Sequence, residues 1–344
     1  MVPHLSTALK GPLLEIESRF LEALPEILRL TGLEVRLGSL SPDVVKPTTV
    51  DLPDGSTLLL EPLLRRQNRL GLDDFDPCAI LLNNDLSSGI PAILRDLDEQ
   101  FVRPPLHAAW AVRRKSNHFA AYDEVAGDFA RLIGIDPWRI NPYFAVCEAV
   151  NFHERQGEEC LAANVDAVLG LIREKYQEYA IYKTPYVVVK ADAGTYGMAV
   201  MTVKDTSQVV ALNRKQRNKM SVIKEGLAVS QVIIQEGVHT FEQVGSGDQA
   251  GVAEPVVYMI DRFVVGGFYR VHGSRGRDES LNVPGMHFEP LAFETSCSLP
   301  DQCQNPDAAP NRFYAYGVVA RLAQLAAALE LERTAPLEEQ LACA

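Results

Sequence analysis

The chain has 344 residues and a formal net charge of −12, because 45 Asp and Glu outnumber 33 Lys and Arg. This acidic balance argues against a general nucleic-acid-binding protein, which needs an excess of basic side chains. A hydrophobic fraction of 47% over this length favours an ordinary soluble protein of about two domains. No run of 18 apolar residues occurs, so we expect neither a membrane span nor a membrane partner.

Cysteine usage and the N-terminal residues bear on location. The first ten residues hold no continuous apolar stretch, so no signal peptide is expected and a reducing, cytoplasmic location is the default. Cys297 and Cys303 are close enough for a bridge or a metal pair. No matching second pair follows them, which favours free thiols. The sequence leaves the oligomeric state open.

The front of the chain mixes a helical pattern with a hairpin pattern. Apolar residues recur at helical spacing over residues 13–30, and Pro25 interrupts them, which predicts a kink or two shorter helices. Residues 49–52 and 57–60 read as two strands. The Asp54-Gly55 pair between them supplies the positive φ that a hairpin turn needs.

A short apolar run at residues 79–82 predicts a buried strand that leads directly into polar residues. Those residues are Asn83, Asn84 and Asp85, and a helix is expected from about Pro91. A strand that passes through a polar loop into a helix is where α/β folds place ligands, so these side chains could orient an amino acid. A capped helix start explains the same pattern equally well.

Three consecutive cations, Arg113, Arg114 and Lys115, form the strongest local positive cluster of this acidic chain. Such a cluster suits a carboxylate or phosphate ligand. A solvated basic turn is an equally good interpretation.

Two longer helices follow. The spacing of apolar residues predicts helices over 122–133, ended by Gly134, and over 161–179. The chain changes from a mixed α/β part to a strand-rich part around residues 140–160. We therefore expect an α/β domain over residues 1–150 and a second domain over residues 151–344.

Residues 186–203 read as a strand, a small-residue turn and a second strand. Lys190 ends the first strand and faces a turn that contains Gly194 and Gly197. Glycines let backbone N–H groups approach phosphate oxygens, and the ammonium neutralises them, so the segment could hold polyphosphate. A plain hairpin with a solvated lysine is the alternative.

The next segments add charge and a strand end. Residues 213–224 carry five Lys and Arg side chains, which suits a solvated helix face or a mobile basic loop over a nucleotide. Residues 232–235 predict a strand that runs into Glu236, Gly237 and Val238. A carboxylate beside exposed backbone at a strand end suits a purine edge or a ribose.

The last predicted elements are a hairpin and a helix. Residues 256–260 and 263–269 predict two strands that end in Arg270, aimed at whatever the strands enclose. A turn with Glu279, Asn282 and Gly285 follows, and the apolar spacing predicts an amphipathic helix over residues 313–331.

This order of elements resembles the ATP-grasp fold, an α+β fold in which two lobes hold ATP, here with an additional α/β N-terminal domain. The resemblance implies that Lys190 takes the phosphates and that Lys183 is the second nucleotide lysine. It also implies a lid over the phosphates, formed by Gly194, Thr195, Tyr196 and Gly197. The strand end that would bind adenine and ribose consists of Gln235, Glu236, Gly237 and Val238. Neither GxxxxGK[ST] nor GxGxxG occurs, so P-loop and Rossmann accounts have no support.

Longer runs resemble the ATP-grasp type of glutamate–cysteine ligase found in proteobacteria. The matching runs include KADAGTYGMAVMTVKD, IIQEGVHTFE, AEPVVYMIDRFVVGGFYRVH, LNVPGMHFEPLAF, LLNNDLSSGIP, RRKSNHFAAYD and GIDPWRINPYF. They cover roughly residues 35–332. The resemblance implies that ATP phosphorylates the γ-carboxylate of glutamate, and that the cysteine amine attacks this acyl phosphate to give γ-glutamylcysteine, the first step towards glutathione.

The same resemblance implies roles for individual residues. Mg²⁺ and lysines neutralise the phosphates, and Arg270 and Lys190 are the expected catalytic residues, with Arg270 stabilising the charge on the acyl phosphate and the tetrahedral intermediate. The expected substrate-binding residues are Asn83, Asn84, Asp85, Arg113, Arg114, Asn282 and Gly285. The expected small-molecule substrates are glutamate, cysteine and ATP.

The chain departs from this family in one respect. Family members carry additional chain between the first helix and the segment that begins near Ile27 here, and it includes an Asp-x-Asn run. Eukaryotic glutathione synthetase, a circularly permuted ATP-grasp enzyme, has its metal-binding Glu-x-Asn pair at a similar early point. Asp192 and Glu279 are the remaining metal candidates. The alternative is therefore a shortened, non-catalytic homologue that binds nucleotide or amino acid without turnover.

Overall fold

The computed structural model describes residues 29–336 with gaps at 31, 52–54, 84–85, 87–88, 98, 110–111, 194–198, 222–227, 246–249 and 291–311. Its contacts divide the chain into two compact units, Met1–Val112 and Arg113–Ala344. This division comes earlier in the chain than the boundary near residue 150 that the sequence suggested. The reason is that helix α2 (Lys115–Ile133) packs along the C-terminal helix α6 (Arg312–Thr334) and so belongs to the second unit.

The first unit is built from short strands. Three of them form a sheet in the order β1-β3-β2, and two further pairs form two-stranded sheets. The strands are β1 (Gly38–Ser39), β2 (Thr48–Asp51), β3 (Thr57–Pro62), β4 (Leu64–Arg66), β5 (Arg69–Gly71), β6 (Ala79–Leu81) and β7 (Phe101–Arg103).

The hairpin predicted for this unit is confirmed. β2 and β3 pair antiparallel, and Gly55 has φ +87°, the left-handed conformation that the Asp-Gly turn was expected to supply. The predicted helix over residues 13–30 lies outside the described residues apart from its last two positions.

Two other expectations for this unit are wrong. The strand at 79–82 is not buried, because β6 pairs only with β7 in a parallel two-stranded sheet and Leu81 is 52% exposed. The chain beyond Pro91 makes a 3₁₀ turn, Ala92–Leu94, in place of the expected helix. One face of the β6–β7 pair packs on the core through Ile80 and Val102, and the other face, with Leu81, is exposed.

The second unit contains two antiparallel sheets. The first has the order β10-β9-β11-β8, and the second has the order β12-β13-β14-β15. The strands are β8 (Phe144–Cys147), β9 (Val187–Ala191), β10 (Val200–Val203), β11 (Val232–Glu236), β12 (Gln243–Val244), β13 (Gly251–Ile260), β14 (Phe263–His272) and β15 (His287–Pro290).

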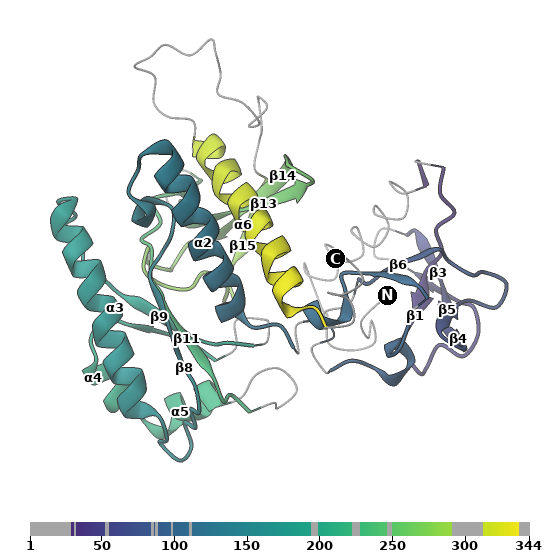
Figure 1. The fold of residues 1–344 in the computed structure, drawn as a ribbon, viewed down its shortest axis with the longest axis horizontal. Helices are drawn as coiled ribbons and strands as arrows, with labels where there is room; N and C mark the ends of the chain where they lie inside the picture. The colour runs from purple at the N-terminus through teal and green to yellow at the C-terminus, as the bar shows by residue number, and fades with distance from the viewer. Residues whose placement is uncertain are drawn as a thin grey trace, which may run out of the picture. The chain divides into compact units, whose positions relative to one another are not determined.

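Helix α3 (Glu158–Glu178) covers one face of the first sheet (Figure 1). The predicted apolar stripe is confirmed, because Val165, Leu169 and Ile172 are buried within the core that α3 shares with the sheet. Burying such side chains stabilises the sheet by about 1.5–3 kcal/mol each. Two short helices follow β10, which are α4 (Ser207–Val210) and α5 (Arg214–Ser221).

The other long helices pack on one another. α2 and α6 lie side by side (Figure 1), and their contact buries Ala126 and Ala326 completely. α2 ends as predicted, with Gly134 at φ +71° as its left-handed cap. Small residues at the contact let the two backbones approach closely. Among the described residues, no helix is long and apolar enough to cross a membrane.

Candidate active site

The site is built on the face of the first sheet that α3 does not cover. Val187, Val189 and Ala191 are buried in the core beneath α3, so Lys190, which alternates with them along β9, projects from the opposite face. Gln235 on the neighbouring strand projects from this same face, and the Lys190 Nζ donates a hydrogen bond of 2.6 Å to its Oε1. The lysine is therefore held in place rather than freely solvated.

The charge of Lys190 interacts with a carboxylate on the second sheet. Burial lowers the pKa of its ammonium, and the negative charge of Glu254 on β13 acts in the opposite direction. A lysine that is short of solvent gains more from an anionic ligand than an exposed lysine does, because fewer water contacts compete. Lys190 is thus suited to bind phosphate oxygens.

Glu254 also holds the arginine that the sequence singled out. Glu254 and Arg270 are register partners on β13 and β14, and the Arg270 Nη1 lies 3.4 Å from the Glu254 Oε2. The Nε of Arg270 is buried and has no hydrogen-bond partner among the described residues. Buried N–H groups are rarely left unpaired, so this nitrogen points to a ligand oxygen that completes the site.

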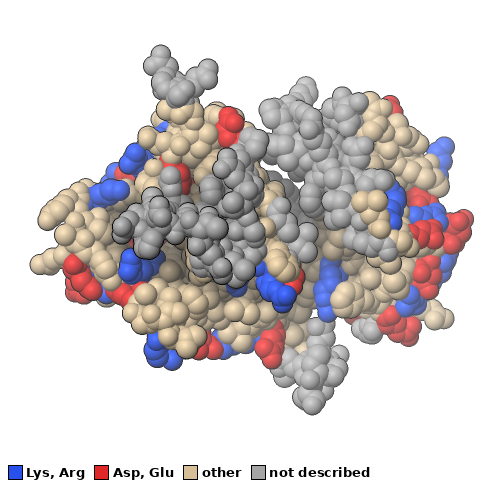
Figure 2. Space-filling model, turned by 90° about the horizontal axis from the view of Figure 1, so that it is seen from above, with Lys and Arg blue, Asp and Glu red and all other residues tan. Residues whose placement is uncertain are grey.

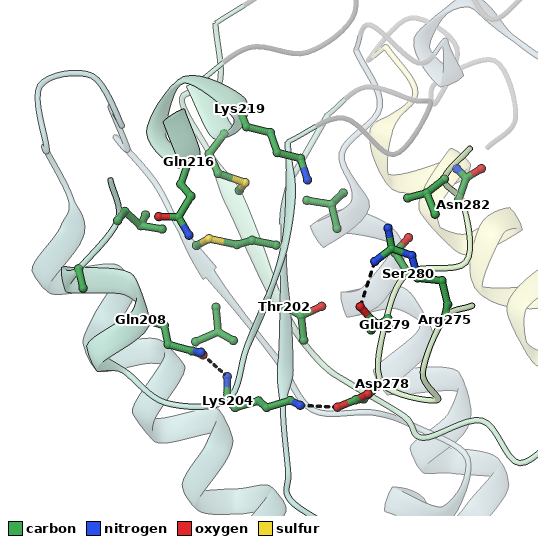
Figure 3. Close-up of a pocket in the computed structure, with 17 residues that line it drawn as sticks. Thr202, Lys204, Gln208, Gln216, Lys219, Arg275, Asp278, Glu279, Ser280 and Asn282 are labelled. Atoms are coloured by element: carbon green, nitrogen blue, oxygen red, sulfur yellow. Dashed lines mark hydrogen bonds and ion pairs between the residues drawn. The ribbon is translucent and has the colours of Figure 1, made fainter. Parts of the chain in front are cut away.

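A cavity of about 690 Å³ lies between β10, α4 and α5 on one side and residues 275–283 on the other. In Figure 3 two ion pairs border it. Lys204 lies 2.5 Å from Asp278, and Arg275 lies 2.9 Å from Glu279. The hydrogen bond from Lys204 is the main reason that the pKa of Asp278 is lowered.

The Lys204–Asp278 pair joins the end of β10 to the segment that follows β14, so it connects the two sides of this cavity. Lys219 and Asn282 also line the cavity (Figure 3). The ammonium, guanidinium and amide groups of this lining can bind a carboxylate, and the two acidic side chains can accept from an ammonium. The lining therefore suits a zwitterionic amino acid.

The strand end after β11 offers backbone rather than a carboxylate. Both oxygens of Glu236 accept from the indole N–H of Trp138 at 3.0 Å, and one also accepts from the backbone N–H of Tyr143. Burial raises the pKa of Glu236, while these hydrogen bonds lower it. The side chain of Glu236 therefore anchors the strand to Trp138 and Tyr143.

Gly237 is required by close packing. A Cβ at this position would lie 2.0 Å from the ring of Tyr186, whose hydroxyl donates to the backbone oxygen of Val238. Val238 itself is 68% exposed. The Gly237 N–H donates to the backbone oxygen of Tyr186 at 2.8 Å, so Tyr186 fixes the path of this segment, and the Gly237 carbonyl and the Val238 N–H are the groups that can face a planar ligand.

The similarity to known proteins agrees with this arrangement. The family model described as "Glutamate-cysteine ligase" matches residues 18–331. The chain belongs to the glutamate–cysteine ligase family. Its reaction is therefore the ligation of glutamate to cysteine, and it is a ligase.

A solved structure supports the same assignment. The crystal structure of a protein from Methylobacillus flagellatus KT, provisionally named gamma-glutamylcysteine synthetase, has 64% sequence identity and a TM-score of 0.82. The match covers 92% of the present chain and 74% of the M. flagellatus chain. A search of curated proteins found no match.

The carboxylate of Asp192 in this ligase is already occupied by protein donors. It is fully buried, and its two oxygens accept from the backbone N–H and the hydroxyl of Ser116 at 2.8 and 2.7 Å. The carboxylate thus satisfies N–H and hydroxyl donors in the first turn of α2, where negative charge also complements the helix dipole. No sequence pattern indicates this partner, which lies 76 residues away.

Glu279 is likewise engaged, because its carboxylate accepts from Arg275 and from the backbone N–H of Gly276. Across the part of the chain that the structure describes, no group of three or more His, Cys, Asp or Glu is arranged to hold a metal ion. The described residues therefore do not fit a preformed magnesium site.

The basic cluster splits into different roles. Arg113 donates to both oxygens of Glu330 on α6 at 2.7 and 2.6 Å, and His118 lies 3.0 Å from the same carboxylate. Glu330 is only 2% exposed, so this contact fixes α2 on α6. Arg113 therefore has a structural role, whereas Arg114 is half-buried just before α2.

Lys115 reaches the site, although the sequence indicated a candidate role for it only as part of the basic cluster with Arg113 and Arg114. Its Nζ donates to the backbone oxygen of Ala191, the residue after Lys190. Burial lowers the pKa of Lys115 to about 8, more than the charge of Asp192 raises it, and Lys190 contributes to the lowering. The only sequence signal was its place at the end of the basic cluster.

The remaining expected residues are scattered or outside the described residues. Gly194, Thr195, Tyr196 and Gly197 and the pair Asn84 and Asp85 lie outside the described residues, and Asn83 belongs to the first unit. Lys183 lines a separate cavity of about 330 Å³. Gly285 has φ +100° and packs against the ring of His272, so its role in the structure is to make a turn.

Charged side chains of both signs occur on the displayed face of the described residues. Figure 2 shows acidic and basic side chains interspersed over the displayed face of the described residues, without a continuous basic area. This distribution matches the acidic net charge of the chain.

Proposed function

We propose that this ligase uses an ATP-grasp site, with ATP bound between the two sheets of residues 113–344. The observations that carry the proposal are the Lys190–Gln235 hydrogen bond on one sheet, the Arg270–Glu254 ion pair on the other, and the Coulomb attraction between Lys190 and Glu254. Two antiparallel sheets that direct cations towards a shared ligand agree with that fold. ATP would supply the phosphoryl group that activates glutamate.

The phosphate-binding part of the proposal falls to Lys190 and Arg270. Lys190 is desolvated and held by Gln235, and Arg270 has one buried N–H without a partner. Both can stabilise negative charge that develops on the phosphoryl group and on the glutamate carboxylate as they join to form γ-glutamyl phosphate. Glu254 restrains the arginine, so that the guanidinium does not have to reorganise during the reaction.

The nucleotide base is assigned to the segment after β11. Gly237 and Val238 offer backbone groups, and Gln235 offers an amide at the end of the same strand. Glutamate is assigned to the cavity of about 690 Å³, whose lining carries both signs of charge. Lys219 and Arg275 can bind its carboxylates, and Asn282 can bind its polar groups.

Mg²⁺ remains outside this mechanism. A magnesium ion bound to ATP needs only one or two protein carboxylates. Asp192 and Glu279 are engaged by Ser116 and by Arg275, so neither is assigned to the ion. An ATP-dependent ligase whose substrate is a thiol also agrees with the expected cytoplasmic location.

ADP release tests the proposal. The purified chain is given MgATP, glutamate and cysteine, with parallel reactions that lack cysteine or contain alanine or glycine as the acceptor. We expect ADP and γ-glutamylcysteine to form fastest with cysteine. A folded protein that binds ATP in calorimetry but releases no ADP above the reaction without cysteine would overturn the proposal and identify a non-catalytic homologue.

A further inference from the structure

Two thiols meet behind the first sheet, on the side away from Lys190. Cys147 is the last residue of β8, and Cys160 lies in the first turn of α3. Their sulfur atoms are 3.2 Å apart. A disulfide bond has a length of about 2.05 Å, so a sulfur movement of about 1 Å separates this contact from a covalent bond.

The surroundings of the two sulfurs make them unequal and hold them together. Cys147 is fully buried, whereas Cys160 is exposed. Asn164, one helical turn after Cys160, lies with its Nδ2 3.1 Å from the Cys147 sulfur and 3.4 Å from the Cys160 sulfur. Burial raises the pKa of the Cys147 thiol to about 12, and its hydrogen bond with Cys160 adds to this effect.

We propose that Cys147 and Cys160 form a reversible dithiol–disulfide pair that small-molecule disulfides oxidise. The exposed Cys160 thiolate attacks one sulfur of a small disulfide, and the first small thiolate leaves. Cys147 then attacks the Cys160 sulfur of the mixed disulfide. Its proton passes to the second small thiolate as that group leaves. The protein loses two electrons and two protons, and the small disulfide becomes two thiols.

The bond would tie the start of α3 to the edge of the first sheet. β8 pairs with β11, the strand that carries Gln235, so the bond would brace the sheet on which the site is built. The loop that it closes is short, from residue 147 to residue 160. A cross-link of this length stabilises chiefly by restricting the unfolded chain, and several degrees of added thermal stability are expected.

Peptide mapping tests the proposal directly. The folded full chain is incubated with cystine or with dithiothreitol, alkylated, and digested with trypsin. Cleavage at Arg139, Arg155 and Arg173 separates the two thiols into peptides 140–155 and 156–173, each with one cysteine. We expect these two peptides to be joined after cystine treatment and to be separate and alkylated after reduction.

Matched variants test the consequence for stability. In the parent chain, cystine should raise the melting temperature by several degrees, and dithiothreitol should reverse the rise. Cys160→Ser should abolish both the rise and the linked peptides, and it should fold because the position is exposed. Cys78→Ser, at another exposed thiol, should change neither result.

Three outcomes would overturn the proposal. They are cysteinylation of Cys160 without linkage to Cys147, linkage of either thiol to Cys297, Cys303 or Cys343, and a melting-temperature rise that persists in Cys160→Ser. None of these readouts depends on ligase activity, so the proposed function stands or fails separately.

Discussion

The two sheets of residues 113–344 are supported in different ways. The first sheet rests on α3 through a continuous apolar core that includes Val187, Val189 and Leu169. Near the second sheet, α6 is fixed to α2 by apolar contacts and by the buried carboxylate of Glu330, which binds Arg113 and His118. The contact of α3 with the first sheet is mainly apolar, whereas the contact of α6 with α2 includes a buried ion pair.

Because of this difference, substitutions in the two regions should affect different properties of the protein. Apolar packing does not respond to pH and tolerates changes on the opposite face of the sheet, so Lys190 can be altered without unfolding the sheet. A buried carboxylate depends on its partners, because a charge left alone in the interior is costly. Substitutions on the first sheet's open face should therefore affect activity, and substitutions between α2 and α6 should affect stability.

The largest expected effect is on activity, at Lys190. Lys190→Met should lower kcat/KM for ATP by roughly 10²- to 10³-fold, because a preorganised cation in a partly desolvated site is lost. The melting temperature should stay within a few degrees of the parent value. Steady-state ADP release and thermal unfolding give the two readouts. Lys46→Met, at an exposed position in the first unit, is the control and should match the parent.

The next effect is on stability, at Arg113. Arg113→Ala should lower the free energy of unfolding by about 3 kcal/mol, because the buried Glu330 carboxylate loses its bidentate guanidinium partner and keeps the contact with His118 Nδ1. The neighbouring Arg114→Ala should cost less than about 0.5 kcal/mol. Urea unfolding of both variants measures the difference. Equal losses for the two arginines would contradict the structural role of Arg113.

A smaller effect tests the link between the sheets, at Glu254. The charge of Glu254 raises the pKa of Lys190 against the lowering by burial. In Glu254→Gln that contribution is removed, so Lys190 should lose its proton at lower pH. The alkaline fall of the kcat/KM profile should then move to lower pH.

The control for this variant is Glu289→Gln. Glu289 lies on β15 beside Tyr269 and so projects from the opposite face to Arg270, whose register partner is Phe288. Its pH profile should match that of the parent. An unshifted profile in Glu254→Gln would show that the two sheets do not communicate through this carboxylate.

The smallest effect concerns Lys115. Burial lowers its pKa to about 8 from an ordinary value of 10.5, so between these pH values the unfolded chain binds a proton that the folded chain has released. The unfolding free energy contributed by this group therefore rises with pH across the window. Lys115→Met should flatten that rise in urea unfolding at pH 8 and pH 10. A rise as steep as in the parent would mean that Lys115 titrates normally.

Local patterns explain how much of the fold could be predicted. The spacing of apolar residues found α3 and the strands around Lys190 and Arg270, because one face of each element is buried and the other is not. The same reasoning failed at residues 79–82, where an apolar run forms one strand of a two-stranded pair that packs on the core on one face and leaves Leu81 exposed on the other. The spacing of apolar residues indicates which side chains favour burial. It does not indicate whether a neighbouring element will cover them.

The sequence alone was enough to predict α3, α6, the C-terminal end of α2 and the Gly55 turn, since these follow from periods and backbone conformations within one segment. Only the tertiary structure decided that Asp192 binds Ser116, that Arg113 binds Glu330, and that Cys147 meets Cys160. Those contacts join side chains on separate elements. A carboxylate or an arginine has the same local signal whether its partner is a ligand or another part of the chain.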